Sequence, residues 1–81
     1  MSAEPDSSAS FTVTATWDPE AGVFYSQSDI PGLHVEAATF DEFVSLVRDL
    51  APEMIADNLP QSKGPFIVRI EGRCDLVLSA A

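Results

Sequence analysis

The order of apolar and polar residues predicts three short strands, one long helix and a fourth strand. Residues 11–17, FTVTATW, alternate strictly, with apolar side chains on one face and threonines on the other. Alternation of β-branched and aromatic residues is typical of a strand with one buried face. Residues 23–28, VFYSQS, are also strand-like and follow the short turn DPEAG. The first two strands should therefore form an antiparallel hairpin.

The pattern leaves open which face of the second strand is buried. Val23 and Tyr25 share one side, and Phe24 and Ser26 share the other. If Phe24 lies opposite the core, it is a candidate contact residue for a partner. An exposed Phe24 is also the one feature that favours small-molecule sensing beside the sheet.

A second turn and a third strand follow. Pro31 and Gly32 suit the two central positions of a type II turn, because Pro fixes φ near −65° and Gly accepts a positive φ. Residues 33–37, LHVEA, then alternate again and predict a third strand. His34 and Glu36 lie opposite its apolar side chains, so we expect both on the open face of the sheet.

A strongly amphipathic helix of about 18 residues is predicted next. Thr39 and Glu42 have the spacing of a capping box at its start. Pro52 interrupts the pattern, which predicts either a kink near residues 48–51 or two abutting short helices. The residues from Asn58 to Pro60 should end the helix. Apolar residues recur at three- and four-residue spacing and form one stripe: Phe40, Phe43, Val44, Val47, Leu50, Ala51, Met54 and Ile55.

The last strand is predicted over residues 65–70, PFIVRI, and Ile67 falls on its open face. The alternation persists past Gly72 to residue 78, which is too long for one strand of so small a sheet. We therefore expect a bend or bulge near Gly72. Residues 74–79, with Leu76 among them, either pair with a second subunit or form a local tail. The inward positions of the whole run are Phe66, Val68, Ile70, Cys74, Leu76 and Leu78.

These elements predict an α+β fold of β-β-β-α-β order. One helix has to cover one face of a four-stranded mixed sheet. The helix returns the chain so that the fourth strand is parallel to the first. A right-handed crossover gives the spatial order 3-2-1-4. The other face is left to solvent, to another copy or to a partner.

The length and net charge of the chain restrict the kinds of partner that it can bind. The chain has 81 residues and a net charge of −9 from 13 acidic and 4 basic side chains. We expect a disordered tail over residues 1–10 and a single domain over residues 11–81. So small a domain favours a homodimer as a way to bury more surface. Few basic residues argue against direct nucleic-acid binding. The acidic surface suits a basic protein partner, or simply solubility.

No pattern in the chain predicts catalysis, a metal site or a cofactor. The only cysteine, Cys74, has no second thiol and is expected to be a small buried residue. Asp18 and Asp29 belong to turns at opposite ends of the second strand, where turn preference explains them. His34 is the only histidine and lacks a clear carboxylate partner. No apolar stretch is long enough to span a bilayer and no signal peptide is visible, so we expect a cytoplasmic protein.

Three motifs carry a family resemblance. WDPEAGVFY at 17–25, SDIPGL at 28–33 and EAxTxxE at 36–42 occur in this order and spacing. Together they resemble the HicB-like antitoxin superfamily, and within it a short bacterial branch of unknown function that lacks a DNA-binding module. The resemblance covers about residues 11–60, and the following strand also fits. It implies a partial ribonuclease H-like fold of the same β-β-β-α-β order.

The resemblance also implies a function. HicB antitoxins bind and silence HicA toxins, which are small basic ribonucleases. The chain would then be a non-catalytic interaction module that neutralises such a toxin; the alternative is a self-associating structural domain with no toxin partner. Because the sequence ends without room for the usual DNA-binding module, we do not expect it to repress its own gene directly. The candidate partner-binding residues are Phe24, His34, Glu36, Ile67 and Leu76.

Overall fold

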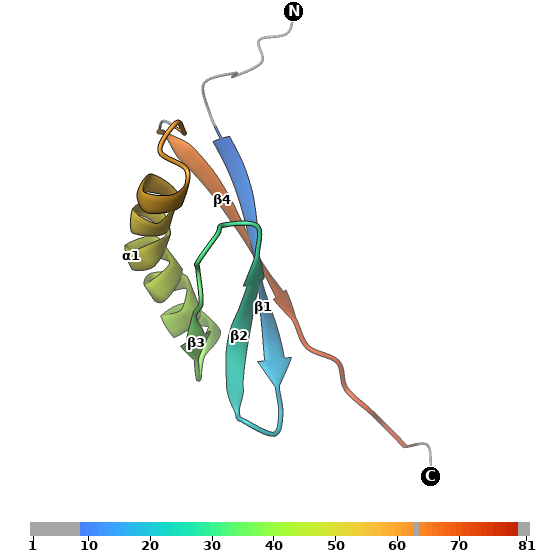
Figure 1. The fold of residues 1–81 in the computed structure, drawn as a ribbon. Coiled ribbons are helices and arrows are strands. Elements are labelled where there is room, and N and C mark those ends of the chain that lie inside the picture. Colours follow the sequence, from blue (N-terminus) through green and yellow to red (C-terminus); the bar gives the residue numbers. More distant parts are fainter. Residues whose placement is uncertain (1–8, 63, 80–81) are drawn as a thin grey trace, which may run out of the picture.

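A single helix lies across one face of a four-stranded sheet (Figure 1). The computed structural model describes residues 9–62 and 64–79. The sheet has the order β3-β2-β1-β4, in which only the β1–β4 pair is parallel. The predicted α+β class, element order and strand order are confirmed. The elements are β1 (Ala9–Asp18), β2 (Val23–Ser28), β3 (Glu36–Ala37), α1 (Phe40–Asn58) and β4 (Phe66–Arg73).

One apolar cluster joins the helix to the sheet. The stripe of α1 that faces the sheet is almost completely buried and packs with the inward side chains of β1. Ile30 and Leu33, which flank the Pro-Gly turn, close one side of the cluster. β1 is central, because it pairs with both β2 and β4. The buried members from β1 and α1 are Phe11, Val13, Ala15, Phe43, Val47, Ala51 and Ile55.

The second turn has the predicted geometry, whereas the third strand is shorter than predicted. Gly32 has a φ of 81°, and the amide of Leu33 donates to the carbonyl of Ile30. Regular pairing of β3 covers only Glu36–Ala37. The amide of Val35 donates to the hydroxyl of Ser26 rather than to a backbone carbonyl. The amide of Ser26 still donates to the carbonyl of Val35 at 3.0 Å, so only one of the two backbone hydrogen bonds of this pair is replaced by a side-chain contact.

The helix begins at its predicted cap and continues through Pro52. Thr39 accepts a hydrogen bond from the amide of Glu42 at 3.1 Å. Phe40–Asn58 form one helix of 19 residues, so the alternative of two abutting helices is wrong. At its end, the side-chain amide of Asn58 donates to the carbonyls of Pro31 and Met54, both at 3.1 Å.

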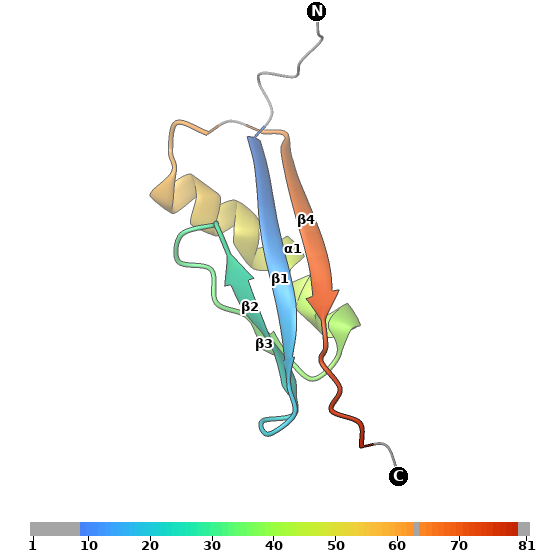
Figure 2. The same cartoon turned by 90° about the vertical axis from the view of Figure 1, so that its right-hand side faces the viewer.

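The fourth strand passes Gly72 without a bulge and ends one residue later, at Arg73. Its pairs with β1 continue one to one as far as Thr16 and Arg73, so the expected bulge at Gly72 is absent. A Cβ at Gly72 would lie 3.4 Å from the ring of Phe40, which covers this position from the helix. After Arg73 the chain leaves the sheet, and residues 74–79 extend away from the body (Figure 2).

The N-terminal boundary differs from the prediction. β1 begins at Ala9, so the last two residues of the predicted tail belong to the sheet, where Ala9 pairs with Phe66. Pairing with the parallel strand β4 extends β1 beyond the alternating run. The rest of the predicted tail, residues 1–8, lies outside the described residues.

The buried stripe of α1 should carry much of the stability. Ile55 is 1% exposed and Leu46, on the same helix, is 36% exposed. We expect Ile55→Ala to lower the free energy of unfolding by about 2–5 kcal/mol, through lost burial and a residual cavity. The matched Leu46→Ala should cost less than about 1 kcal/mol. Urea unfolding of both variants measures the difference; equal losses would contradict this packing.

The two glycines with positive φ should differ in their tolerance of a side chain. Gly22 has a φ of 71° with no atom near its missing Cβ, whereas at Gly32 a Cβ would lie 3.2 Å from Asn58 and 3.3 Å from Met54. Both alanine variants carry backbone strain of about 1 kcal/mol. Gly32→Ala should lose more, because the side chains of Asn58 and Met54 must also shift. Thermal unfolding of the pair tests this order.

Candidate protein-interaction surfaces

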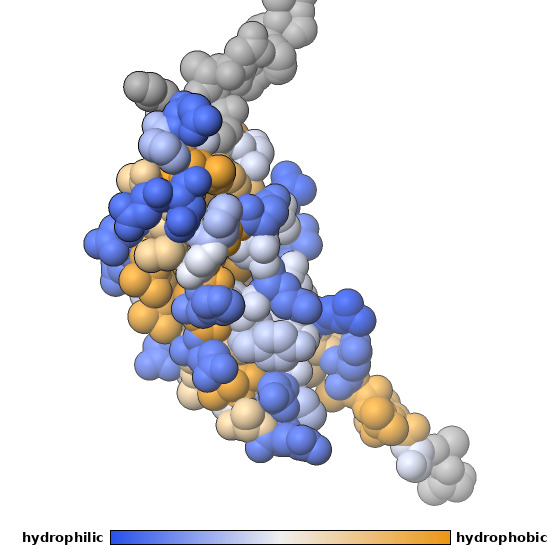
Figure 3. Space-filling view, viewed as in Figure 1, coloured by the Kyte–Doolittle hydropathy of each residue, from blue (hydrophilic) through white to orange (hydrophobic). Residues whose placement is uncertain are grey.

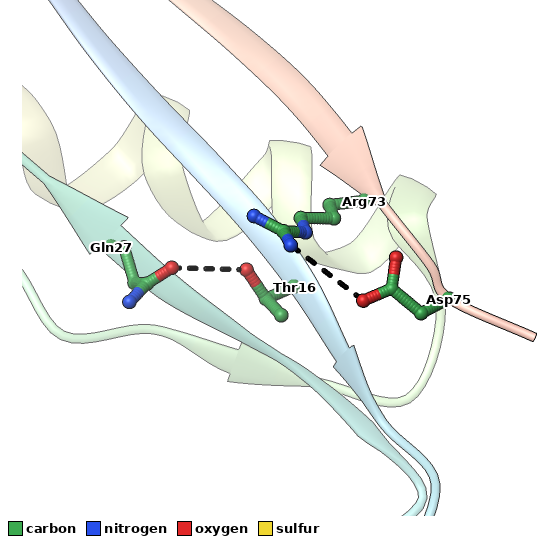
Figure 4. Close-up of polar contacts among 4 residues, drawn as sticks. All are labelled: Thr16, Gln27, Arg73 and Asp75. Atoms are coloured by element: carbon green, nitrogen blue, oxygen red, sulfur yellow. Dashed lines mark hydrogen bonds and ion pairs between the residues drawn. The ribbon is translucent and has the colours of Figure 1, made fainter.

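The sheet face opposite the helix is polar. Thr12, Thr14 and Thr16 form a column along β1, flanked by side chains of both signs on β4. The hydroxyl of Thr16 donates to the Gln27 side-chain carbonyl at 3.2 Å (Figure 4). Arg73, the last residue of β4, forms an exposed ion pair at 3.6 Å with Asp75 in the segment that follows. This open face offers hydrogen bonds and mixed charges rather than an apolar platform.

A shallow pocket lies at one end of the open face. It has a volume of about 350 Å³, and His34 and Glu36 line it together with Tyr25 and Asp18. Glu36 stands opposite Tyr25 in the pairing of β2 with β3. The structure therefore brings two of the five candidate residues together, on the face where they were predicted. His34 and Glu36 are both exposed at this pocket.

Phe24 lies on the helix side of the sheet, so it is not a contact residue of the open face. It stands opposite Trp17 in the β1–β2 pairing, and their ring centroids are 4.9 Å apart. The ring of Phe40 from α1 lies 5.9 Å away on the other side. Phe24 is drawn inward because the cross-strand position beside Trp17 belongs to the core face. An exposed Phe24 was the one sequence feature in favour of a small-molecule site, and the structure does not place Phe24 on the open face.

The remaining candidates lie apart from the pocket. Ile67 is 54% exposed on the open face of β4, opposite Ser10. Leu76 is 75% exposed in the segment that follows β4. Cys74 is exposed as well, and the prediction of a buried cysteine was wrong. The alternation that suggested burial continues along the chain, but the helix does not reach past Arg73 to cover it.

An apolar groove between α1 and β4 was not predicted. The groove has a volume of about 430 Å³ and is floored by Phe66, Val68 and Ile70. These inward residues are only half-buried, whereas Phe11 and Val13, the neighbours of Val68 and Ile70 on β1, are buried. One helix centred on β1 is too narrow to cover β4 too. The wall from α1 consists of Val44, Val47, Arg48, Ala51, Pro52 and Ile55.

Acidic side chains gather on the outer side of α1. Asp41 and Glu42 lie in its first turn, where they favour the helix dipole. Asp49, Glu53 and Asp57 follow at four-residue spacing, all exposed. The last turn of α1 holds no basic residue. Hydrophilic surface covers this side and the open face, with apolar surface between them (Figure 3).

The carboxylates of the two turns, Asp18 and Asp29, accept hydrogen bonds from backbone amides. Asp18 accepts from the amides of Glu20 and Ala21, and Asp29 accepts from the amide of Thr12. Within residues 9–62 and 64–79, no three His, Cys, Asp or Glu side chains converge closely enough to hold a metal ion. Over the same residues, no helix has the length and apolar character needed to cross a bilayer.

Comparison with known proteins places the chain beside sequences without an assigned function. The family model of a domain of unknown function, DUF1902, matches residues 10–73. A crystal structure of a hypothetical protein from the extremely thermophilic bacterium Thermus thermophilus is similar, with 37% identity and a TM-score of 0.74. The match covers 85% of this chain and 99% of that protein. No curated protein matches the chain.

The two neighbours Phe24 and Tyr25 should respond differently to truncation. Phe24→Ala should lower the free energy of unfolding by about 2–3 kcal/mol, less than for a fully buried ring. It should also shift the fluorescence of Trp17, whose ring it contacts. Tyr25→Ala, on the open face, should cost about 1 kcal/mol or less and leave the emission unchanged. A larger loss for Tyr25 would reverse the assignment of faces.

Proposed function

The chain belongs to the DUF1902 family, and we propose that it is a non-catalytic protein-interaction module of the HicB antitoxin type. In this role it would bind and neutralise a small basic ribonuclease toxin in the cytoplasm. Two observations support the proposal: the resemblance of the sequence to a known family and the distribution of charge on the helix. The proposal also adopts the HicB-like, partial ribonuclease H-like interpretation of the fold.

The acidic row on α1 is the observation that carries the proposal. Asp49, Glu53 and Asp57 are neighbours along one line of the helix, at four-residue spacing. Like charges at this spacing destabilise a helix. Asp57 also lies in the last turn, where the helix dipole disfavours an anion. The free protein thus bears an electrostatic cost on one exposed face. A cationic partner bound to this face would relieve the repulsion between these carboxylates, and the free energy that is released would add to the affinity.

The resembling motifs support the fold part of the proposal. The residues 17–25 form the end of β1, its turn and the start of β2, and residues 28–33 include the type II turn. The residues 36–42 supply β3 and the cap of α1. These motifs therefore set the hairpin, the turn and the entry to the helix.

A non-catalytic role agrees with how the carboxylates are used. Asp18 and Asp29 accept backbone amides and shape turns, and they belong to opposite ends of β2. Two-metal nuclease chemistry needs carboxylates that converge on two ions a few ångströms apart. The hydrogen bonds of Asp18 and Asp29 give both residues a structural role in the turns.

The alternative is a self-associating structural domain without a toxin. The exposed apolar segment after β4 favours this interpretation, because Leu76, Val77 and Leu78 are 75%, 96% and 83% exposed. A gene for a small basic protein beside this one would favour the antitoxin. Self-association and toxin binding use different faces and are compatible.

Neutralising the acidic row should weaken partner binding and stabilise the free protein. We expect wild type to retain a small basic protein from a lysate of the native host at low salt and to release it at high salt. The variant Asp49→Asn, Glu53→Gln, Asp57→Asn should retain much less. Its free energy of unfolding should rise by about 0.5–1.5 kcal/mol, since two like-charge contacts and one unfavourable dipole contact are removed.

A control variant replaces a single carboxylate away from the row. Glu20→Gln, in the exposed β1–β2 turn, should leave both capture and stability unchanged. The captured protein is then tested as a ribonuclease, with and without the purified chain. Capture of nucleic acid instead of protein, or a captured ribonuclease that stays fully active, would refute the antitoxin role.

A further inference from the structure

Two apolar features of the chain lack a partner within its described residues. One is the groove between α1 and β4, whose floor is Phe66, Val68 and Ile70. The other is the segment 74–79, which carries Leu76, Val77 and Leu78 into solvent (Figures 1 and 3). The segment lies beyond the end of β4 and runs away from the groove of its own chain. A second copy, however, could bring its segment to this groove.

The edge of β4 is suited to pair with another strand. β4 is the last strand in the sheet order, so no strand of the described chain lies beside its outer edge. An unpaired edge offers a row of backbone donors and acceptors. If residues 74–79 continue the pleat of β4, Cys74, Leu76 and Leu78 face the helix side, as Val68 and Ile70 do. Asp75 and Val77 then face the open side, with Arg69 and Arg73.

A two-fold antiparallel pairing restricts the possible registers. Directly opposed residues must share a face, so the axis has to pass through a residue rather than between two. An axis at Arg73 sets Arg73 against the partner's Arg73 and Glu71 against the partner's Asp75. An axis at Glu71 sets Glu71 against the partner's Glu71 and Arg69 against the partner's Arg73. Both registers oppose like charges, which is destabilising.

With the axis at Gly72, each charged residue lies opposite a residue of opposite charge and each apolar residue lies opposite another apolar residue. On the open face, Arg69 meets the partner's Asp75, and Glu71 meets the partner's Arg73. Ile67 meets the partner's Val77 on the same face. On the helix side, Val68 meets the partner's Leu76, and Phe66 meets the partner's Leu78. The charged pairs are all of opposite sign, and the apolar pairs lie where the groove is open.

We propose that two copies pair antiparallel along β4 about Gly72, with Leu76 and Leu78 of each copy filling the groove between α1 and β4 of the other. The two sheets then form one continuous sheet of eight strands. The absence of a side chain at Gly72 lets the two strands meet on the axis, beneath the ring of Phe40. Within one copy, Arg73 and Asp75 form an exposed ion pair at 3.6 Å. In the dimer this pair is replaced, because Arg73 meets the partner's Glu71 and Asp75 meets the partner's Arg69. This pairing does not depend on the toxin.

Disulfide cross-linking tests the register. Cysteines replace Ile67 in one preparation and Val77 in another, both with Cys74→Ala; the two sites are more than half exposed. In the proposed dimer, position 67 lies opposite position 77 of the partner. Positions 67 of the two copies are ten residues apart along the strands, roughly 33 Å, beyond reach of a disulfide. Mixing the two preparations before oxidation should therefore raise cross-linked dimer at least about tenfold over either alone.

The control mixture combines Ile67→Cys with Glu71→Cys, which the pairing sets roughly 20 Å apart, and it should give no mixed cross-link. Cross-linking of Ile67→Cys with itself, or none in the first mixture, would overturn the proposal. So would a mass of a single 8.7 kDa chain for wild type by light scattering at micromolar concentration.

Charge exchange is a second, non-covalent test. Arg69→Asp alone and Asp75→Arg alone each place like charges at two positions of the dimer. An equimolar mixture of the two restores opposite charges at both positions. We expect each single variant to dimerise several-fold more weakly than wild type and the mixture to recover wild-type affinity, measured by sedimentation. Equal weakness of the mixture would refute the pairing of Arg69 with the partner's Asp75.

Discussion

The contact between the buried stripe of α1 and the inward face of β1 is the constraint on which the rest of the structure depends. Phe43, Val47 and Ile55 are at most 1% exposed, and Val13 of β1 is fully buried with them. β1 pairs with β2 on one side and with β4 on the other, so this packing also fixes the hairpin and the parallel strand β4 beneath the helix. A domain of this size has little other apolar burial to rely on. The hairpin turn, the type II turn and the helix cap serve to place these two elements face to face.

One helix does not bury the whole inward face of the sheet. Because α1 packs over β1, the inward side chains of β4 remain half-exposed beside it. The opposite side of α1 carries acidic residues that serve no contact within the described part of the chain. The molecule thus presents an apolar strand edge and a charged helix surface that differ in the partner they suit. We propose another copy of the chain as the partner of the first and a basic protein as the partner of the second.

Most of the fold could be predicted from the sequence because its signals are local. Strict alternation in β1, the Pro31–Gly32 turn and the Thr39 cap each act over a few residues and appear in the structure as predicted. The face of Phe24, which the sequence left open, and the exposure of Cys74, which was predicted wrongly, both depend on surroundings that are set at a distance. Phe24 faces inward because Trp17 lies across from it, and Cys74 is exposed because the helix ends short of it. The groove depends on the width of a helix relative to the sheet, which no local pattern reports.

Asn58 ties the end of the helix to the turn that follows β2. Its side-chain amide reaches the carbonyl of Pro31, 27 residues away in sequence, as well as that of Met54 within α1. The last helical turn and the Pro-Gly turn should therefore open together as one cooperative unit rather than fray separately. The amides of Leu33 and Leu59, which bond to Ile30 and Ile55, would then exchange their hydrogens with solvent at matched rates. Local motion at this end of the molecule would be shared between helix and turn.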